Sequence, residues 1–380
     1  MDSARRYRCP AQQRGAVAVM VVVMAVVLIG FAALVVDVGM LYAAKADLQR
    51  SADAAALAGL SAYISDDVLL EDQAAIQQAA TSRAQQYGLA NATLGHATTI
   101  DLFDIALGHH DLANPTSALD FNGPLNAVQV TARRTAESSN GAVPFFFARI
   151  WGHNSGDVTA TARAAVDDRF RGVNANQSPP LIPISIDLAT YNERLSAGND
   201  EYGYDGSWVL GSGDGINESK IFPEEDKDDD DDGAGNFGLL NIDGSGNAVQ
   251  VGAQIRDNIS PSELTNEFGT SQIVYYDEGG GAITYSIKGT TGLKASIEFD
   301  LEQRVGQVIG FFVHDSVSGN GSNAVFNNVG VRFGRLMDVE LNGKDKWVVV
   351  QPVVYTSDAV IVGDGAPSSE GMVVDIQLVQ

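Results

Sequence analysis

An uncharged apolar segment of twenty-one residues, Ala16 to Val36, constrains this 380-residue chain more than any other feature. As an α-helix it would be about 30 Å long, which matches the hydrocarbon core of a bilayer. A cleaved signal peptide is the competing interpretation, but its apolar region is only about 7–15 residues long and ends at a small-residue cleavage site. We therefore predict one uncleaved transmembrane helix over residues 16–36.

The distribution of basic residues predicts the orientation of this helix. Four arginines lie within the first fourteen residues, against a single aspartate. After the apolar segment, Lys45 and Arg50 are balanced by neighbouring aspartates. Because positive residues favour the cytoplasmic side of a membrane, we expect residues 1–15 to form a cytoplasmic tail. The chain from Asp37 onward would then lie outside the cytoplasm.

Charge and cysteine content exclude two classes of protein. The formal net charge is -24, which argues against a nucleic-acid partner, because phosphates attract a basic surface. The one cysteine, Cys9, lies in the basic tail, so no intramolecular disulfide framework can form in the rest of the chain. The exported part must therefore be stabilised by its packed core.

The residues around the apolar segment form an ordered pattern. It consists of Arg14-Gly15 before the segment, Asp37-x-Gly39-x-x-Tyr42-x-x-Lys45-x-x-Leu48-Gln49 after it, and then Ala52-Asp53-Ala54-Ala55-Ala56-Leu57-Ala58-Gly59. These motifs resemble the N-terminal signature of the TadG-like family, the TadE/G-like proteins of Flp pilus assembly. Looser similarity continues through most of the chain.

The resemblance implies a function and a location. It implies a membrane-anchored structural or assembly component of a Tad (Flp) pilus or related secretion apparatus, without enzyme activity. Its expected partners are Tad pilus-assembly components or pilus subunits and the membrane, with no nucleic acid. Its expected location is the bacterial inner membrane, single-pass, with a periplasmic or extracellular C-terminal region. The alternative is a membrane-tethered adhesin or envelope-binding module, stabilised by calcium.

The pattern after the membrane predicts a helical stem and a small sheet over residues 37–166. Apolar and alanine residues recur at helical spacing to about Tyr63, and a second helix is expected from Glu71 to Gly88. Short alternating segments between turn signals predict an antiparallel sheet from about Thr98 to Val166. An N-terminal apolar helix followed by a sheet is a pilin-like arrangement.

The apolar segment Pro144 to Trp151, PFFFARIW, admits two interpretations. It could fill the core between helix and sheet, or it could dock a partner. Large exposed aromatic patches are rare on monomers. We therefore expect the segment to lie in the core.

The remainder predicts a linker and a β-rich domain. Residues 167–180 are polar and end in two prolines, as linkers often do. Residues 181–380 contain apolar strand segments divided by glycine-rich turns, and only Val251 to Ile259 suggests a helix. A β-sandwich or partly open barrel is expected. The predicted fold class is thus α+β with one transmembrane helix, a pilin-like proximal domain and a mainly β distal domain.

An acidic segment offers the one candidate metal site. Asp228, Asp230 and Asp232 alternate and are followed by Gly233, which fits the opening of a calcium loop. An EF-hand would also need glutamate at the twelfth position, which here is Leu239. A looser calcium site or a solvated acidic loop remain as alternatives, and no other cofactor is expected.

Catalytic patterns are sparse. His314 and Asp315 follow an apolar strand segment, but no nucleophile motif accompanies them. Asp243-x-Ser245-x-Asn247 partly matches the Asp-x-Ser-x-Ser metal motif of von Willebrand A-type domains, which some larger family members contain, but it lacks the last serine. We therefore predict that the protein is not an enzyme.

Overall fold

The structure is a computed structural model. It describes residues 13–65, 69, 73–114, 116–123, 125–204, 208–211, 213–221, 236–244, 247–342, 346–369 and 373–379.

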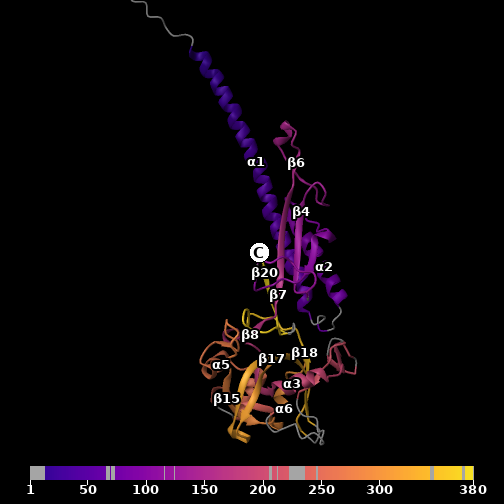
Figure 1. The fold of residues 1–380 in the computed structure, drawn as a ribbon, viewed down its shortest axis with the longest axis vertical. Helices are drawn as coiled ribbons and strands as arrows, with labels where there is room; N and C mark the ends of the chain where they lie inside the picture. The colour runs from indigo at the N-terminus through magenta and orange to yellow at the C-terminus, as the bar shows by residue number, and fades with distance from the viewer. Residues whose placement is uncertain are drawn as a thin grey trace, which may run out of the picture.

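A continuous helix of 48 residues, α1 (Gln13–Leu60), begins the described chain. Its N-terminal half projects alone beyond the rest of the molecule, whereas its C-terminal half packs against strands (Figure 1). No proline interrupts it, and alanine, a strong helix former, is frequent in its second half. α1 therefore connects an isolated apolar segment rigidly to a folded domain.

The proximal part is a four-stranded antiparallel sheet, packed against two helices. The strand order is β20-β7-β4-β3, with bounds β3 (Ile105–Gly108), β4 (Ala127–Arg134), β7 (Val158–Asp167) and β20 (Asp375–Val379). The second half of α1 and α2 (Gln73–Ala90) contact each other and the sheet. Buried alanines such as Ala52, Ala56 and Ala80 fill the interface. Their small side chains allow the backbones to approach closely.

The distal part is built on a closed ring of five strands. β17 pairs with β15, β15 with β13, β13 with β9, β9 with β16, and β16 returns to β17. β18 and then β12 extend this sheet from the second half of β17. The bounds are β9 (Leu181–Asp187), β12 (Ser219–Lys220), β13 (Phe237–Leu240), β15 (Tyr285–Thr291), β16 (Val308–Ser318), β17 (Ala324–Glu340) and β18 (Trp347–Pro352). The predicted α+β class is confirmed. Of the two architectures expected for the distal domain, sandwich or barrel, the ring corresponds to the barrel.

Both faces of β9, β13 and the first part of β16 are buried, because helices and a second sheet cover them. Phe311 lies in a cluster with residues of α3, α4 and α6, whereas its neighbour Phe312 lies in one with residues of α5 and a three-stranded sheet. The covering elements are α3 (Leu188–Ser196), α4 (Ala248–Asp257), α5 (Pro261–Phe268), α6 (Glu298–Glu302), β8 (Phe170–Asn174), β14 (Gln272–Val274) and β19 (Val360–Val362). Burial on both faces explains the continuous apolar segments in β9 and β16.

The distal helices differ from the expectation. The segment predicted as helical corresponds to α4, but α3, α5 and α6 were not anticipated. α5 begins with a capping box of Ser260 and Glu263, has Pro261 in its first turn, and ends at Gly269 with φ of 71°. Eight residues are too few to display a clear helical period, so the end signals were the informative ones.

Two segments depart from the predicted domain bounds. The expected linker, residues 167–180, contains strand β8, which pairs with β14 and β19 and buries Phe170 and Val173. The chain's last strand, β20, does not join the distal domain but pairs with β7 of the proximal sheet. A strand pairs according to where the chain returns in space, which local composition does not reveal.

Candidate membrane and assembly interface

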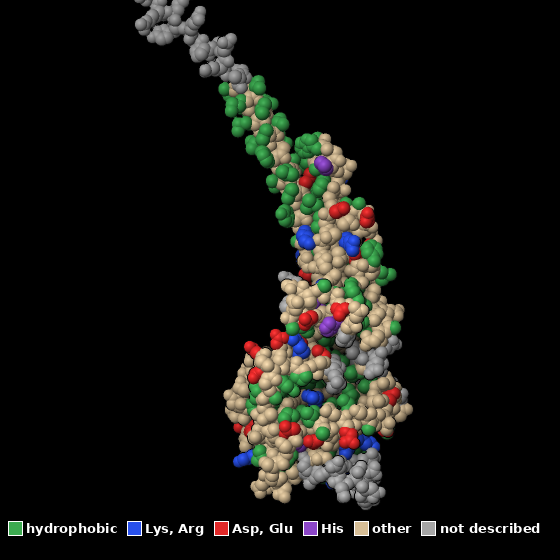
Figure 2. All heavy atoms as spheres, viewed as in Figure 1, with side chains coloured by type: hydrophobic (Ala, Val, Ile, Leu, Met, Phe, Trp, Pro, Cys, Tyr) green, Lys and Arg blue, Asp and Glu red, His purple; other side chains and the backbone are tan. Residues whose placement is uncertain are grey.

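The N-terminal half of α1 exposes apolar side chains along its length. Among the described residues, α1 is the one helix that is long and apolar enough to cross a bilayer. Val22, Val26 and Ile29 are 62%, 64% and 66% exposed, and Figure 2 shows hydrophobic side chains on every visible side of the projecting helix. Exposure of this kind is favourable in lipid and unfavourable in water.

Beyond the apolar segment, one stripe of α1 binds the backbone of the proximal strands. Lys45 Nζ donates to the carbonyl oxygen of Thr159 at 2.5 Å. Gln49 Nε2 donates to the carbonyl oxygen of Thr161 at 3.2 Å and to Asp53 at 2.8 Å. The side chains at the signature positions 45 and 49 therefore hold α1 alongside β7.

A second stripe of α1 supplies the proximal core. Leu48, Ala52 and Ala55 are fully buried. At Gly59, an added Cβ would lie 3.0 Å from Val128 Cγ1 on β4 and 3.1 Å from the carbonyl oxygen of Ala80 on α2. These positions of the signature are therefore explained by close packing.

A third stripe of α1 faces away from the domain. Tyr42 is 74% exposed and Val35 is 69% exposed. Gly39 and Ala46 are also exposed on this side. The spacing of three to four residues places them in one row that continues the apolar surface of the membrane-spanning segment. The row includes the signature positions Gly39 and Tyr42, and its exposed surface is available for another helix.

The aromatic segment after β5 (Val143–Pro144) does not enter the core, so the expectation for residues 144–151 was wrong. It forms a loop and a short 3-10 helix, η4 (Ala148–Trp151), before β6 (Ser155–Gly156). Phe146, Ile150 and Trp151 are 72%, 76% and 66% exposed. The β5–β6 hairpin extends past the end of the sheet, so these side chains have no facing layer to cover them.

Asp37 of α1 holds this loop in place. Its carboxylate accepts hydrogen bonds from the backbone N–H groups of Phe146 and Ala148, both at 2.7 Å, and of Phe147 at 3.1–3.2 Å. Asp37 is only 4% exposed. The carboxylate therefore caps the start of η4 from a different segment of the chain, as an N-cap residue would.

We expect Asp37→Ala to loosen the loop without unfolding the domain. The variant leaves three N–H groups without their acceptor. Amide hydrogen exchange of residues 145–153 should become faster, while exchange in β16 and β17 of the distal ring should stay unchanged. Asp37→Asn, whose amide oxygen can still accept, should have a smaller effect. Equal exchange in Asp37→Ala and the original protein would contradict the capping role.

The sequence offered several groups of candidate residues. Asp228, Asp230 and Asp232 lie outside the described residues, so the calcium prediction stays a prediction. Asn247 caps α4 by accepting from the N–H of Gln250 at 2.9 Å, which gives it a structural role.

His314 and Asp315 lie where the pairing of β16 with β17 is irregular, and their side chains have different surroundings. His314 is buried and its Nδ1 lies 2.8 Å from Ser185 Oγ. Asp315 is exposed, and its carboxylate accepts from Ser316 at 2.7 Å and Asn327 at 2.9 Å. The two side chains therefore do not form a catalytic pair.

The structure assembles an acidic cluster that the sequence analysis missed. Oxygens of Asp200, Asp214 and Glu218 lie within 4.8 Å of one another. Burial raises the pKa of Glu218, although backbone N–H donors, including those of Glu201 and Tyr202, act to lower it. Gln351 donates to both Asp214 and Glu218 at 3.0–3.1 Å. These hydrogen bonds give the carboxylates a structural role in the loop. We therefore assign no cation to the cluster.

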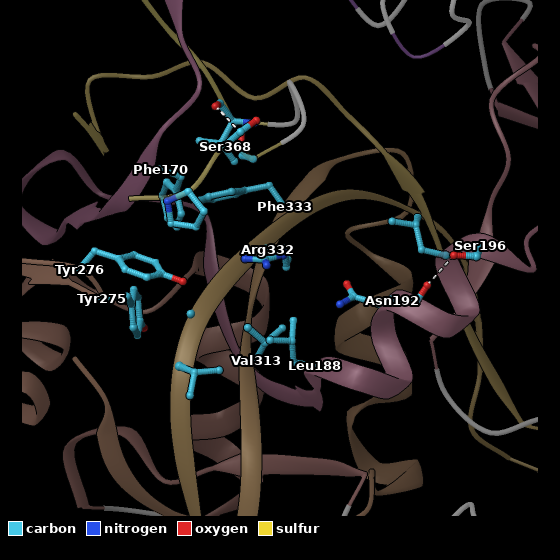
Figure 3. Close-up of a pocket in the computed structure, with 16 residues that line it drawn as sticks. Phe170, Leu188, Asn192, Ser196, Tyr275, Tyr276, Val313, Arg332, Phe333 and Ser368 are labelled. Carbon is cyan, nitrogen blue, oxygen red and sulfur yellow. Dashed lines mark hydrogen bonds between the residues drawn. The ribbon is translucent and has the colours of Figure 1, made fainter. Parts of the chain in front are cut away.

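A cavity of about 440 Å³ lies in the distal part, lined by residues of β8, α3, β16 and β17 and of the segment before β20. Figure 3 shows Arg332 near its centre, with Phe170 and Phe333 on one side and Leu188 and Val313 on the other. Its described lining residues include no histidine, cysteine or carboxylate. These side chains offer no general base or metal ligand set, and the cavity supports no catalytic assignment.

Comparison with known proteins gives two family matches in the N-terminal region. Residues 15–62 match the family described as Flp pilus-assembly TadE/G-like, and residues 43–164 match the family described as Tad-like Flp pilus-assembly. No curated protein and no solved structure matches the chain. The two matches cover α1 from Gly15 and nearly all of the proximal domain except β20. The resemblance to the TadG-like Flp pilus-assembly family is thus confirmed over residues 15–164.

Proposed function

We propose that the protein is a membrane-anchored structural component that assembles or anchors a Tad (Flp) pilus or a related secretion apparatus. The observation that carries this proposal is the continuity of α1. One helix presents an apolar surface of membrane length in its first half and is bound into a folded domain in its second half. A force or displacement on the exported domain is thereby transmitted to the membrane helix without a flexible joint.

The proposed location is the bacterial inner membrane, with the N-terminus in the cytoplasm. The arginines before the apolar segment support this orientation through the positive-inside rule. The proximal and distal domains would then lie in the periplasm or outside the cell. Their surface carries the excess negative charge of the chain, which favours solubility there.

The proposed contact surface is the outward stripe of α1 defined by Val35, Gly39, Tyr42 and Ala46. Val35 lies in the last turn of the membrane segment and the other three lie directly beyond it, where the apolar helix of a pilus subunit or assembly component would also emerge. Small residues at positions 39 and 46 would allow close approach of a second helix. Tyr42 would supply a large aromatic contact to it.

Site-specific photocrosslinking in the native cell tests this proposal. A photoreactive amino acid at position 42 should capture pilus subunits or Tad assembly components. The control is the same amino acid at position 299, because Phe299 is a similarly exposed aromatic residue, 70% exposed, on distal helix α6. If position 42 captures only envelope polymers or unrelated receptors while pilus components are expressed, the tethered adhesin would be favoured instead.

A further inference from the structure

The loop from Phe145 to His153 ends in a group of exposed hydrophobic side chains. Phe146, Ile150 and Trp151 are each about two-thirds or more exposed. Phe146 also packs edge-on against Phe147, with ring centroids 4.8 Å apart. Large aromatic and aliphatic side chains collected at one tip are unfavourable in water and mark a contact with another apolar phase.

The loop lies at the level where the membrane-spanning segment ends. Asp37, the first charged residue after that segment, binds the loop backbone. Ala33, one turn before Asp37 and within the membrane-spanning segment, is 4% exposed, whereas its neighbours Leu34 and Val35 are 57% and 69% exposed. α1 contacts both β5 and η4, and Figure 2 shows hydrophobic side chains at the tip of the proximal domain beside α1.

The backbone of the loop is suited to a medium with little water. The N–H groups of Ile150, Gly152 and His153 donate to carbonyl oxygens within the loop at 3.0–3.1 Å, and that of Phe145 donates to Asn154, just after the loop, at 3.0 Å. Those of residues 146–148 donate to Asp37. Polar backbone groups must be satisfied internally wherever lipid replaces water. The loop can therefore enter the interface without leaving these donors unpaired.

The side chains of the loop match the chemistry of the lipid interface. Tryptophan and other aromatic residues favour the headgroup level, where one edge is apolar and the other meets water. Arg149 is exposed between the apolar residues, and its long side chain can extend to lipid phosphates. Residues 145–153 contain no carboxylate, so no acidic side chain of the loop itself competes with lipid phosphates for Arg149.

We propose that residues 145–153 insert into the headgroup–acyl boundary of the outer leaflet of the bilayer that α1 spans. This inference rests on the proposed membrane anchor. The loop then provides a second membrane contact, and Asp37 links it to α1. Two contacts fix the rotation of α1 about its axis and the height of the exported domain above the lipid. The outward stripe of α1 would thereby always face the same direction in the membrane.

Fluorescence quenching in vesicles tests the insertion. The full-length protein carries Cys9→Ser and one new cysteine, Ile150→Cys, labelled with an environment-sensitive fluorophore. It is reconstituted in phosphatidylethanolamine–phosphatidylglycerol vesicles that contain lipid with a nitroxide near the headgroup or near the acyl end. Because interfacial segments lie about 5–10 Å into the boundary, the shallow nitroxide should remove about half or more of the fluorescence, and the deep one less.

Two control positions separate the loop from the anchor. Phe299→Cys on the distal α6 should remain unquenched, and Val26→Cys in the middle of the apolar segment should be quenched most by the deep nitroxide. Quenching at position 26 without quenching at position 150 would overturn the loop proposal while retaining the anchor. Absence of quenching at position 26 would instead reject the anchor itself.

A second labelled position guards against local perturbation. Phe146→Cys should behave as Ile150→Cys does, because both side chains belong to the same tip. If both positions escape the lipid nitroxides yet are protected from a water-soluble maleimide in the native cell, a protein partner or a second copy covers the loop. That result would also overturn insertion into lipid.

Discussion

Two arginines in the apolar half of α1, Val22→Arg and Val26→Arg, are expected to abolish membrane anchoring. The segment 16–36 contains thirteen Val, Leu, Ile and Phe residues, which together favour insertion by about 5 kcal/mol, at roughly 0.3–0.6 kcal/mol each. Each arginine near the centre costs about 3 kcal/mol. The pair therefore offsets the whole gain, whereas one arginine leaves a net preference for the membrane.

Cell fractionation followed by alkaline extraction of the membranes measures this effect. The double variant should be found outside the extracted membranes, and Val26→Arg alone should stay largely within them. The matched control, Val22→Leu with Val26→Leu, preserves apolarity and should remain fully anchored. If the double arginine variant resists extraction, another part of the protein holds it at the membrane, and α1 is not the anchor.

The second large effect is expected from Gly59→Leu, at the point where α1 meets both α2 and β4. A side chain there collides with Val128 and with the backbone of Ala80, so both neighbours must move. Overpacking of a core typically costs about 1–3 kcal/mol. We expect a loss of about 2 kcal/mol in local stability, or roughly 30-fold faster amide exchange in α2 and β4.

Gly39→Leu is the matched control on the same helix. Nothing lies within 4 Å of an added Cβ at Gly39, and leucine favours the helix over glycine by up to about 1 kcal/mol. The same substitution should therefore have opposite signs at the two positions. Hydrogen exchange on the full-length protein in detergent compares them directly. Unchanged exchange in Gly59→Leu would contradict the close packing of α1 on the proximal sheet.

Much of the N-terminal architecture could be predicted from the sequence. The apolar segment 16–36 and the helical spacing that follows it depend on local composition and period, which a sequence displays directly. The distal helices were harder. α3 and α5 are nine and eight residues long, so their signal lay in caps such as Asp187 and Ser260, and strand patterns around them dominated the interpretation.

The candidate sites depended more strongly on the fold. Asp200, Asp214 and Glu218 are up to eighteen positions apart, and they converge because β10 (Tyr202–Tyr204) pairs antiparallel with β11 (Trp208–Leu210), which returns the chain to Asp200. His314 and Asp315 are adjacent in sequence, yet the His314 side chain is buried beside Ser185 and that of Asp315 is exposed. Proximity along the chain was therefore a poor guide to proximity in space.

The sequence by itself determined that α1 is apolar over a membrane length, that residues 15–164 resemble proteins of Flp pilus assembly, and that the chain as a whole is α+β. Only the tertiary structure decided that β20 completes the proximal sheet and that the aromatic segment after β5 lies outside the core. The physical reason is that hydrophobicity specifies a need for burial, whereas the partner that provides it depends on where distant segments meet.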